Sequence, residues 1–372
     1  MKNAFTILTT LLSVLFASFT TAQDFDVYVS DAANFSTGPW HIYKYDKNGF
    51  NGQKFISDHL GWPQDILFLE DQNIVLISNL NDGTITKYNA DTGEYIGVFA
   101  SGIGGPTRMS IGPDGLLYVL QWQGNGKVKR YQLNGTSMGD FTASGVSNSI
   151  GIAWDEDGNL YVSSYNGGFV KKFSSSGVDL GFFITGLNGP TNIWFGTNGD
   201  FYVSDWNEGV VKRYSPTGQF KSTVVTGVSQ VEGVALYPNG NFAIGVGSCS
   251  CVNVYKPDGT LVTNLVSPGA AGLIRPNAVV FRQKDATPQK EVFKEQVIVH
   301  PNIGSHFRIS GIDADFVNKE MEVYNAAGTL VQKIELDSAT TWDASHLPNG
   351  MYYLTIKLEE GYIGRQEIIV QK

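Results

Sequence analysis

Several polar residues with metal-binding oxygen atoms lie near the starts of regularly spaced apolar segments. Asp65, Asn192 and Glu232 each lie one or two residues inside such a segment. Carboxylate and amide oxygens are ligands of hard cations, so this set predicts a Ca²⁺ or Mg²⁺ site if the segments converge. Arg108 and Asn277 occupy similar positions at the predicted channel mouth, and the arginine would repel a cation unless it pairs with Asp65 or Glu232. The simpler interpretation is that these side chains bond to one another and to water.

The scarcity of histidine limits the kinds of catalysis that this chain can perform. Five histidines occur in 372 residues, and only His41 and His59 fall within the repeated region. General acid–base catalysis and zinc binding both rely on imidazole groups. The sequence therefore favours a protein that is not an enzyme, with a metal-dependent enzyme as the alternative.

Three aromatic residues recur at one position of the repeated segments. Trp122, Tyr165 and Trp206 each follow the second expected strand of three successive repeats. Equivalent positions of a repeat lie at the same place in each unit, so the three side chains are predicted to share one rim. Exposed aromatic rings can stack on sugars or bind a protein partner. Packing between neighbouring repeats is the simpler interpretation.

An internal repeat supplies the elements that position these residues. Apolar first strands begin at residues 63, 106, 149, 190, 231 and 276, so successive starts are 43, 43, 41, 41 and 45 residues apart. Each repeat continues with a Gly-containing turn and further short strands, which together fit a four-stranded unit. A unit that is apolar on both faces must be covered on both sides, and a closed ring of units does this. We therefore expect an all-β fold with a six-bladed β-propeller over residues 23–283.

The two ends of the repeated region are expected to close this ring. The mature chain opens with a second strand at residues 26–30, and the region ends on a lone first strand at residues 277–281. Pairing these strands within one blade would remove the open sheet edges that a broken ring exposes.

One repeat resembles a known family in its details. The run Phe201-Tyr202-Val203-Ser204-Asp205-Trp206, followed by Gly209-Val210-Val211, resembles the NHL repeat and the related YWTD and gluconolactonase-type propellers. The resemblance covers about residues 24–283 and implies the fold, because this architecture hosts lactonases, lyases and binding proteins alike. In the gluconolactonase group, a Glu, an Asn and an Asp around the axis hold a metal ion. Asn192 and Glu232 resemble that set in kind, although the family's local Asn-Gly context is missing.

The N-terminus and the charge balance indicate where the protein works. Lys2 begins a short positive region, an apolar run follows, and small residues end at Ala22, so residues 1–22 are predicted to be a signal peptide. No later stretch has the roughly 20 apolar residues that a transmembrane helix needs. The net charge is -9, which does not favour nucleic acid as a partner. We expect a secreted or surface-exposed protein.

The composition changes after the repeated region. Residues 284–296 are charged, contain Pro288 and lack strand alternation, so they are predicted to form a linker. Residues 297–372 alternate apolar and polar side chains between Gly and Asn-Gly turns. This pattern predicts a compact antiparallel β-sandwich as the C-terminal domain.

Four motifs of this domain resemble a secretion signal. They are Val299-His300-Pro301-Asn302, Val323-Tyr324-Asn325-Ala326-Ala327-Gly328, Leu347-Pro348-Asn349-Gly350-Met351-Tyr352-Tyr353 and Ile368-Ile369-Val370-Gln371-Lys372. Together they resemble the C-terminal sorting domain of the type IX secretion system of Bacteroidetes, with one departure at Ile303, where the family usually has a second proline. The resemblance implies contact with the type IX machinery and passage across the outer membrane. A generic carbohydrate-binding or stabilising β-sandwich is the alternative.

The only two cysteines are Cys249 and Cys251, so no disulfide framework holds the fold together. In a strand, residues two apart lie about 6.5 to 7 Å from each other, near the upper limit for a disulfide. The sequence therefore favours two small buried thiols, with a Cys-Ser-Cys bridge as the alternative.

These patterns favour one function over another. The leading hypothesis is an exported, non-catalytic propeller that binds an extracellular glycan or protein through the aromatic rim of Trp122, Tyr165 and Trp206. The alternative is a Ca²⁺- or Mg²⁺-dependent hydrolase of the lactonase type, with Asp65, Asn192 and Glu232 at the channel mouth.

Overall fold

The computed structural model describes residues 25–283, 298–301, 303–310, 320–325, 329–336, 341–357 and 363–372. The chain divides into two compact units, Met1–Lys284 and Asp285–Lys372. The predicted signal peptide, residues 1–22, and the predicted linker, residues 284–296, lie outside the described residues.

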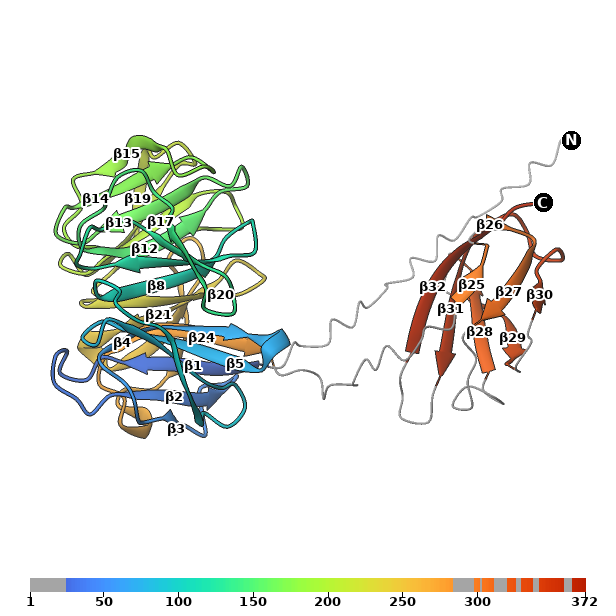
Figure 1. The fold of residues 1–372 in the computed structure, drawn as a ribbon, viewed down its shortest axis with the longest axis horizontal. Helices are drawn as coiled ribbons and strands as arrows, with labels where there is room; N and C mark the ends of the chain where they lie inside the picture. Colours follow the sequence, from blue (N-terminus) through green and yellow to red (C-terminus); the bar gives the residue numbers. More distant parts are fainter. Residues whose placement is uncertain are drawn as a thin grey trace, which may run out of the picture. The chain divides into compact units, whose positions relative to one another are not determined.

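The described part of the first unit consists of six four-stranded antiparallel sheets, which we call blades 1 to 6 in chain order (Figure 1). The innermost strands are β24 (Pro276–Gln283), β4 (Pro63–Leu69), β8 (Pro106–Ile111), β12 (Ser149–Trp154), β16 (Pro190–Phe195) and β20 (Val231–Leu236). The second strands are β1 (Phe25–Asp31), β5 (Ile74–Asn79), β9 (Leu117–Gln121), β13 (Leu160–Ser164), β17 (Phe201–Asp205) and β21 (Phe242–Val246). The predicted repeat of four strands is confirmed.

The outer half of each blade completes the sheet. The third strands are β2 (His41–Asp46), β6 (Thr84–Asn89), β10 (Lys129–Tyr131), β14 (Phe169–Phe173), β18 (Val210–Tyr214) and β22 (Cys251–Tyr255). The fourth strands are β3 (Gln53–Ile56), β7 (Tyr95–Ala100), β11 (Ser137–Asp140), β15 (Asp179–Thr185), β19 (Phe220–Thr226) and β23 (Leu261–Val266). Short 3-10 helices lie at η1 (Glu70–Gln72), η2 (Gly247–Cys249) and η3 (Ala270–Gly272).

The six innermost strands form a ring, because each lies beside the innermost strands of the two neighbouring blades. Second strands such as β13 and β17 are buried along their whole length, so both faces of a blade need cover. Neighbouring blades supply it. Trp194 of blade 5 packs on Phe242 of blade 6, with ring centroids 5.3 Å apart. The predicted six-bladed propeller is confirmed.

Blade 1 joins the two ends of the propeller. β24 pairs antiparallel with β1 in the register Val29↔Val279, and β2 and β3 follow on the outside. The predicted ring closure is therefore correct. Near the end of β24, the Arg282 guanidinium lies 3.0 Å from carboxylate oxygens of both Glu70 and Asp91 in blade 2. These ion pairs fix the last strand to the neighbouring blade.

The turn between the third and fourth strands of each blade makes a close backbone contact with the preceding blade. In blade 6 this turn contains Gly259 with φ +88°, and a Cβ atom there would collide with the carbonyl oxygen of Val224 in blade 5. The equivalent turn of every blade meets the end of the preceding blade, in its fourth strand or, for Gly177, directly after it. These glycines are Gly49, Gly93, Gly135, Gly177, Gly218 and Gly259. Glycine is required here because side chains would separate the blades.

The second unit contains two sheets in its described residues. One consists of β25 (Ile298–His300), β27 (His306–Ser310) and β30 (Thr341–Asp343). The other consists of β26 (Ile303–Gly304), β32 (Ile363–Val370), β31 (Gly350–Lys357), β28 (Glu320–Asn325) and β29 (Leu330–Glu335). Buried side chains of both sheets, including Phe307, Trp342 and Leu354, form one core. The predicted sandwich is confirmed, with one difference: β26 pairs parallel with β32, so the sandwich is not purely antiparallel.

Candidate functional site

The candidate site lies on the face of the propeller where the innermost strands begin and the second strands end, which we call the rim face. A backbone hydrogen bond recurs there. The N–H after a second strand donates to the carbonyl oxygen just before the innermost strand: Trp122 to Gly105 at 2.8 Å, Tyr165 to Asn148 at 3.0 Å and Trp206 to Gly189 at 2.9 Å. This bond holds the three aromatic residues at equivalent positions of blades 3, 4 and 5.

Arg108 of β8 lies at the centre of the predicted channel mouth. Its Nε donates to Asn192 Oδ1 at 3.2 Å, and its Nη2 donates to Glu232 Oε1 at 3.0 Å. The same guanidinium donates to the backbone carbonyls of Gln64 and Asn277. One side chain of blade 3 thus binds blades 1, 2, 5 and 6, and only 4% of it is exposed.

The other polar residues of the mouth also bond to one another. Asn192 Nδ2 donates to the Glu232 carbonyl at 2.6 Å, and Asn277 Nδ2 donates to the Pro63 carbonyl at 2.8 Å. Asp65 Oδ2 accepts from the Met109 N–H at 2.7 Å. These are the mutual bonds that the simpler interpretation of the sequence describes.

Burial raises the pKa of both carboxyl groups at the mouth. The pKa of Glu232 rises to about 7, because burial outweighs the attraction of Arg108 and the nearby Asp65 carboxylate opposes its ionisation. Burial also raises the pKa of Asp65, against the attraction of Arg108. One guanidinium faces two carboxyl groups, so the buried set is electrically neutral when one carboxyl group holds a proton.

The arrangement at the mouth does not fit a divalent cation. The Asn192 and Glu232 side-chain oxygens that would bind a metal ion both accept from Arg108, which brings a positive charge to the same place. Among the described residues, no group of three or more His, Cys, Asp and Glu side chains is arranged to hold a metal ion. The metal site of Asp65, Asn192 and Glu232 stays a prediction that this geometry does not favour.

A serine motif elsewhere in the propeller also lacks the geometry for catalysis. Gly135-Thr136-Ser137-Met138-Gly139 matches the Gly-x-Ser-x-Gly spacing of serine hydrolases. In those enzymes the serine lies on a turn between a strand and a helix. Ser137 instead begins the outer strand β11, so the match reflects the glycine of the blade turn.

The predicted aromatic rim residues are half-buried on the rim face. The rings of Trp122 and Tyr165 lie next to each other, with centroids 5.6 Å apart. Tyr165 donates its hydroxyl hydrogen to Asn207 Oδ1 at 3.1 Å, which connects blade 4 to blade 5. The rings thus pack between blades and still reach the surface, and their role in ligand binding stays a prediction.

Two further aromatic residues join this group, and the sequence reasoning missed them. Phe35 lies 5.5 Å from Trp62 and 6.2 Å from Trp206 between ring centroids. The Arg275 guanidinium lies over the Phe35 ring at 4.5 Å. Phe35 comes from blade 1 and Trp206 from blade 5, so the segment 32–40 reaches across the rim face. Its length was the available signal, because the equivalent connections have four residues in blades 2, 4, 5 and 6 and seven residues, 122–128, in blade 3.

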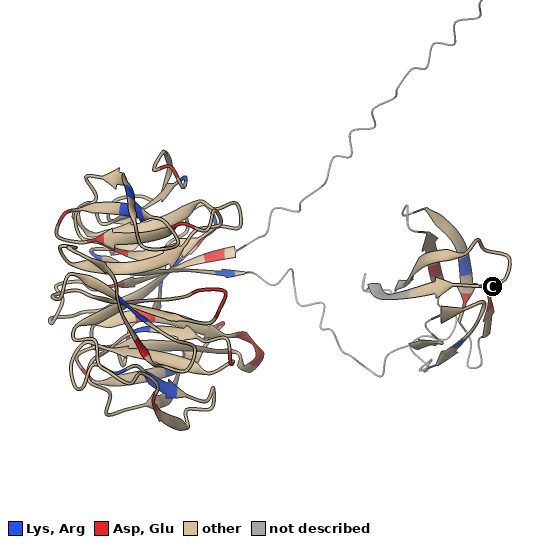
Figure 2. Cartoon of the chain, turned by 90° about the horizontal axis from the view of Figure 1, so that it is seen from above, with Lys and Arg blue, Asp and Glu red and all other residues tan. Residues whose placement is uncertain are grey.

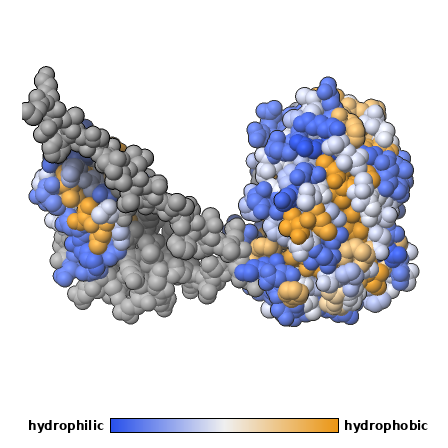
Figure 3. All heavy atoms as spheres, turned by 180° about the vertical axis from the view of Figure 1, so that it is seen from behind, coloured by the Kyte–Doolittle hydropathy of each residue, from blue (hydrophilic) through white to orange (hydrophobic). Residues whose placement is uncertain are grey.

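We call Trp122, Tyr165, Trp206, Phe35 and Trp62 the aromatic arc. Charged residues of both signs are scattered over the propeller rather than gathered in one patch (Figure 2). Apolar side chains reach the propeller surface elsewhere too (Figure 3), and the outer strands expose Phe182 and Phe220 by 65% and 59%. The aromatic arc differs from these because it gathers five aromatic side chains on the face that carries the channel mouth.

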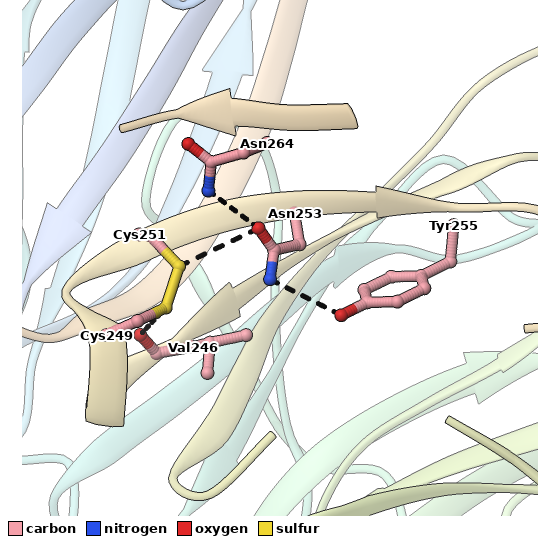
Figure 4. Close-up of a disulfide and its surroundings, with 6 residues drawn as sticks. All are labelled: Val246, Cys249, Cys251, Asn253, Tyr255 and Asn264. Atoms are coloured by element: carbon pink, nitrogen blue, oxygen red, sulfur yellow. Dashed lines mark hydrogen bonds between the residues drawn. A yellow bond between two sulfur atoms is a disulfide. The ribbon is translucent and has the colours of Figure 1, made fainter. Parts of the chain in front are cut away.

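The two cysteines form a disulfide, which corrects the expectation of two free thiols (Figure 4). The strand does not run through both residues as the sequence reasoning assumed. Cys249 ends η2, Ser250 has φ 54°, and only Cys251 belongs to β22. This turn brings the two Cα atoms to 5.2 Å, within the usual range for a disulfide.

Comparison with known proteins identifies the C-terminal unit. Residues 302–371 match the model of a family described as the secretion system C-terminal sorting domain. The second unit is thus a type IX sorting domain, as its motifs predict, and the protein is exported to the cell surface or secreted. Among the described residues, no helix has the length and apolar character to cross a membrane. No curated protein matches the sequence.

Solved structures with the same fold match the propeller. A chain of a nidogen/laminin complex is 14% identical with a TM-score of 0.58, covering 69% of this chain and 98% of its own. A Bacteroides caccae protein of unknown function is 13% identical with a TM-score of 0.55, covering 70% and 100%. A gluconolactonase from Xanthomonas campestris is 13% identical with a TM-score of 0.50, covering 72% and 86%. At these identities the matches establish the fold alone.

Proposed function

We propose that this exported propeller is a binding module that holds an extracellular glycan or protein on the aromatic arc of its rim face. The observation that carries the proposal is the convergence of five half-buried aromatic side chains from blades 1 to 5. Aromatic residues supply large contact areas with few rotatable bonds, and they are enriched where proteins bind partners.

The channel mouth supports binding over catalysis. Its two carboxyl groups are buried and held near Arg108, whose side chain already bonds to four other blades. A catalytic acid or base must reach the substrate atom that it protonates or deprotonates. Similar folds come from a protein complex and from a gluconolactonase, so fold alone does not choose between the two roles. The hydrogen bonds that hold Arg108 favour the binding role.

The test compares the full chain with variants of the arc on arrays of extracellular glycans and secreted proteins. Trp122→Ala and Trp206→Ala should each weaken the binding of whichever ligand the parent protein holds. Phe182→Ala is the matched control, because Phe182 is an exposed aromatic residue on outer strand β15. Unchanged ligand binding by both tryptophan variants would refute the proposal.

The lactonase-type alternative makes a different prediction. It requires a Ca²⁺ or Mg²⁺ ion on Asp65, Asn192 and Glu232, and Arg108 would have to leave its present partners first. Metal analysis of the purified protein and lactone hydrolysis with added Ca²⁺ or Mg²⁺ distinguish the two functions. Metal-dependent hydrolysis that is lost in Asn192→Ala would favour the enzyme.

A further inference from the structure

We infer that the ligand of the aromatic arc is an uncharged glycan, bound across the rim face with sugar rings on the aromatic side chains and hydroxyl groups on neighbouring amides. This inference rests on the proposed binding function and specifies the class of ligand.

The first observation is that an amide follows each predicted rim aromatic. Gln123 follows Trp122, Asn166 follows Tyr165, and Asn207 follows Trp206. All three amide residues are exposed, whereas the aromatic residues beside them are half-buried. An amide group both donates and accepts hydrogen bonds, as a sugar hydroxyl does. The pairing of a ring face with an amide therefore matches a sugar, which has an apolar face and a hydroxylated edge.

The second observation concerns two buried polar atoms at the start of β4. Trp62 Nε1 and Gln64 Oε1 have no hydrogen-bonding partner among the described residues. One is a donor and the other an acceptor, and Gln64 is only 2% exposed. Buried polar groups are nearly always hydrogen-bonded in folded proteins. A hydroxyl group can accept from an indole N–H or donate to an amide oxygen. Phe35 of the arc lies beside Trp62.

The charges near the arc favour a neutral ligand over an acidic or basic one. Arg275 donates to the Ala33 carbonyl at 2.5 Å and to Gln230 Oε1 at 3.3 Å, so its guanidinium is held by the protein. Glu208, two residues after Trp206, pairs with Lys212 at 2.8 Å. The charged groups of Arg275 and Glu208 thus have partners within the propeller, while the Gln123 side chain is exposed.

The experiment measures binding of the full chain to neutral hexasaccharides of glucose, xylose and mannose, with acidic oligogalacturonate and heparin fragments on the same array. We expect at least one neutral oligosaccharide to bind, and Trp122→Ala and Trp206→Ala to weaken it about tenfold. Gln123→Ala should weaken it about fivefold. Because Gln123 is exposed, this variant tests the inference even if a tryptophan variant folds poorly. Phe182→Ala should bind like the parent protein.

The other outcomes separate this inference from the proposed function. Neutral oligosaccharide binding that none of the three rim variants reduces would overturn the inference. So would binding of acidic glycans alone, or the absence of any neutral ligand. A protein ligand that depends on Trp122 and Trp206, with no glycan bound, would overturn the glycan class and leave the binding function standing. Ligand binding that no substitution in the aromatic arc changes would overturn both the inference and the proposed function.

Discussion

Replacing Glu232 by Gln should change how the stability of the propeller depends on pH. The pKa of Glu232 is raised to about 7 from an ordinary value of 4.5, because the carboxyl group is buried and lies near Asp65. Between these two pH values the folded state binds more protons than the unfolded state. The free energy of unfolding must therefore decrease as the pH rises from 4.5 through 7, and the difference amounts to about 3 kcal/mol.

Glu232→Gln keeps an oxygen that can accept from Arg108 and removes the titration. The variant leaves one guanidinium and one carboxyl group, Asp65, at the mouth. We expect the parent protein to lose about 3 kcal/mol relative to the variant between pH 4.5 and pH 8, with most of the change complete shortly above pH 7. The stability added by the proton is thus present at low pH and lost at high pH.

Urea denaturation at several pH values, followed by tryptophan fluorescence, measures this difference. Six of the seven tryptophans lie in residues 25–283, so the signal reports mainly on the propeller. Glu208→Gln is the control, because it removes a more exposed carboxylate on the same face and should keep the parent pH profile. Parallel profiles of the parent and Glu232→Gln would show that Glu232 does not hold a proton at the mouth, and the charge argument would be wrong.

Three further predictions concern stability. Gly259→Ala should lower the free energy of unfolding by about 3 kcal/mol, because φ is positive there and the new Cβ atom would collide with blade 5. Gly199 has a similar φ and open space around it, so Gly199→Ala should lower the free energy of unfolding by only about 1 kcal/mol. Equal losses in urea denaturation would contradict the blade contact. Changing Cys249 and Cys251 together to Ala should lower the free energy of unfolding by about 1.6 kcal/mol, because the disulfide closes a loop of only three residues. A loss above about 4 kcal/mol in urea denaturation would show that the disulfide stabilises the protein by more than closing this loop. Arg282→Gln should lower the free energy of unfolding by about 1 kcal/mol at low salt and by less in 1 M NaCl, because its partners Glu70 and Asp91 are exposed. A loss of stability that does not change with salt would exclude the ion pairs as its cause.

Local sequence patterns were sufficient for the architecture and for part of the site. Strand alternation, Gly turns and a spacing near 42 residues predict the blades, because each blade repeats the same local requirements. The position of Trp122, Tyr165 and Trp206 follows from the same register. The disulfide could not be predicted reliably, since the left-handed turn at Ser250 decides the distance between Cys249 and Cys251.

The contacts across the channel mouth depend on residues from different blades. Arg108 meets Asn192 and Glu232, which lie 84 and 124 residues further along the chain. No local pattern shows whether such polar residues share a metal ion or bond to a guanidinium, because the outcome depends on where a long side chain lies after the ring has closed. Phe35 illustrates the same limit, since it reaches Trp206 only through a segment that crosses the rim face.

The sequence alone thus determined the repeat, the ring closure and the export signal, because each follows from local alternation, turn residues or short motifs. The tertiary structure decided that Arg108 occupies the centre of the mouth and that Phe35 and Trp62 extend the aromatic rim into an arc. Both depend on side chains that ring closure brings together from distant blades, and ring closure is a property of the whole propeller.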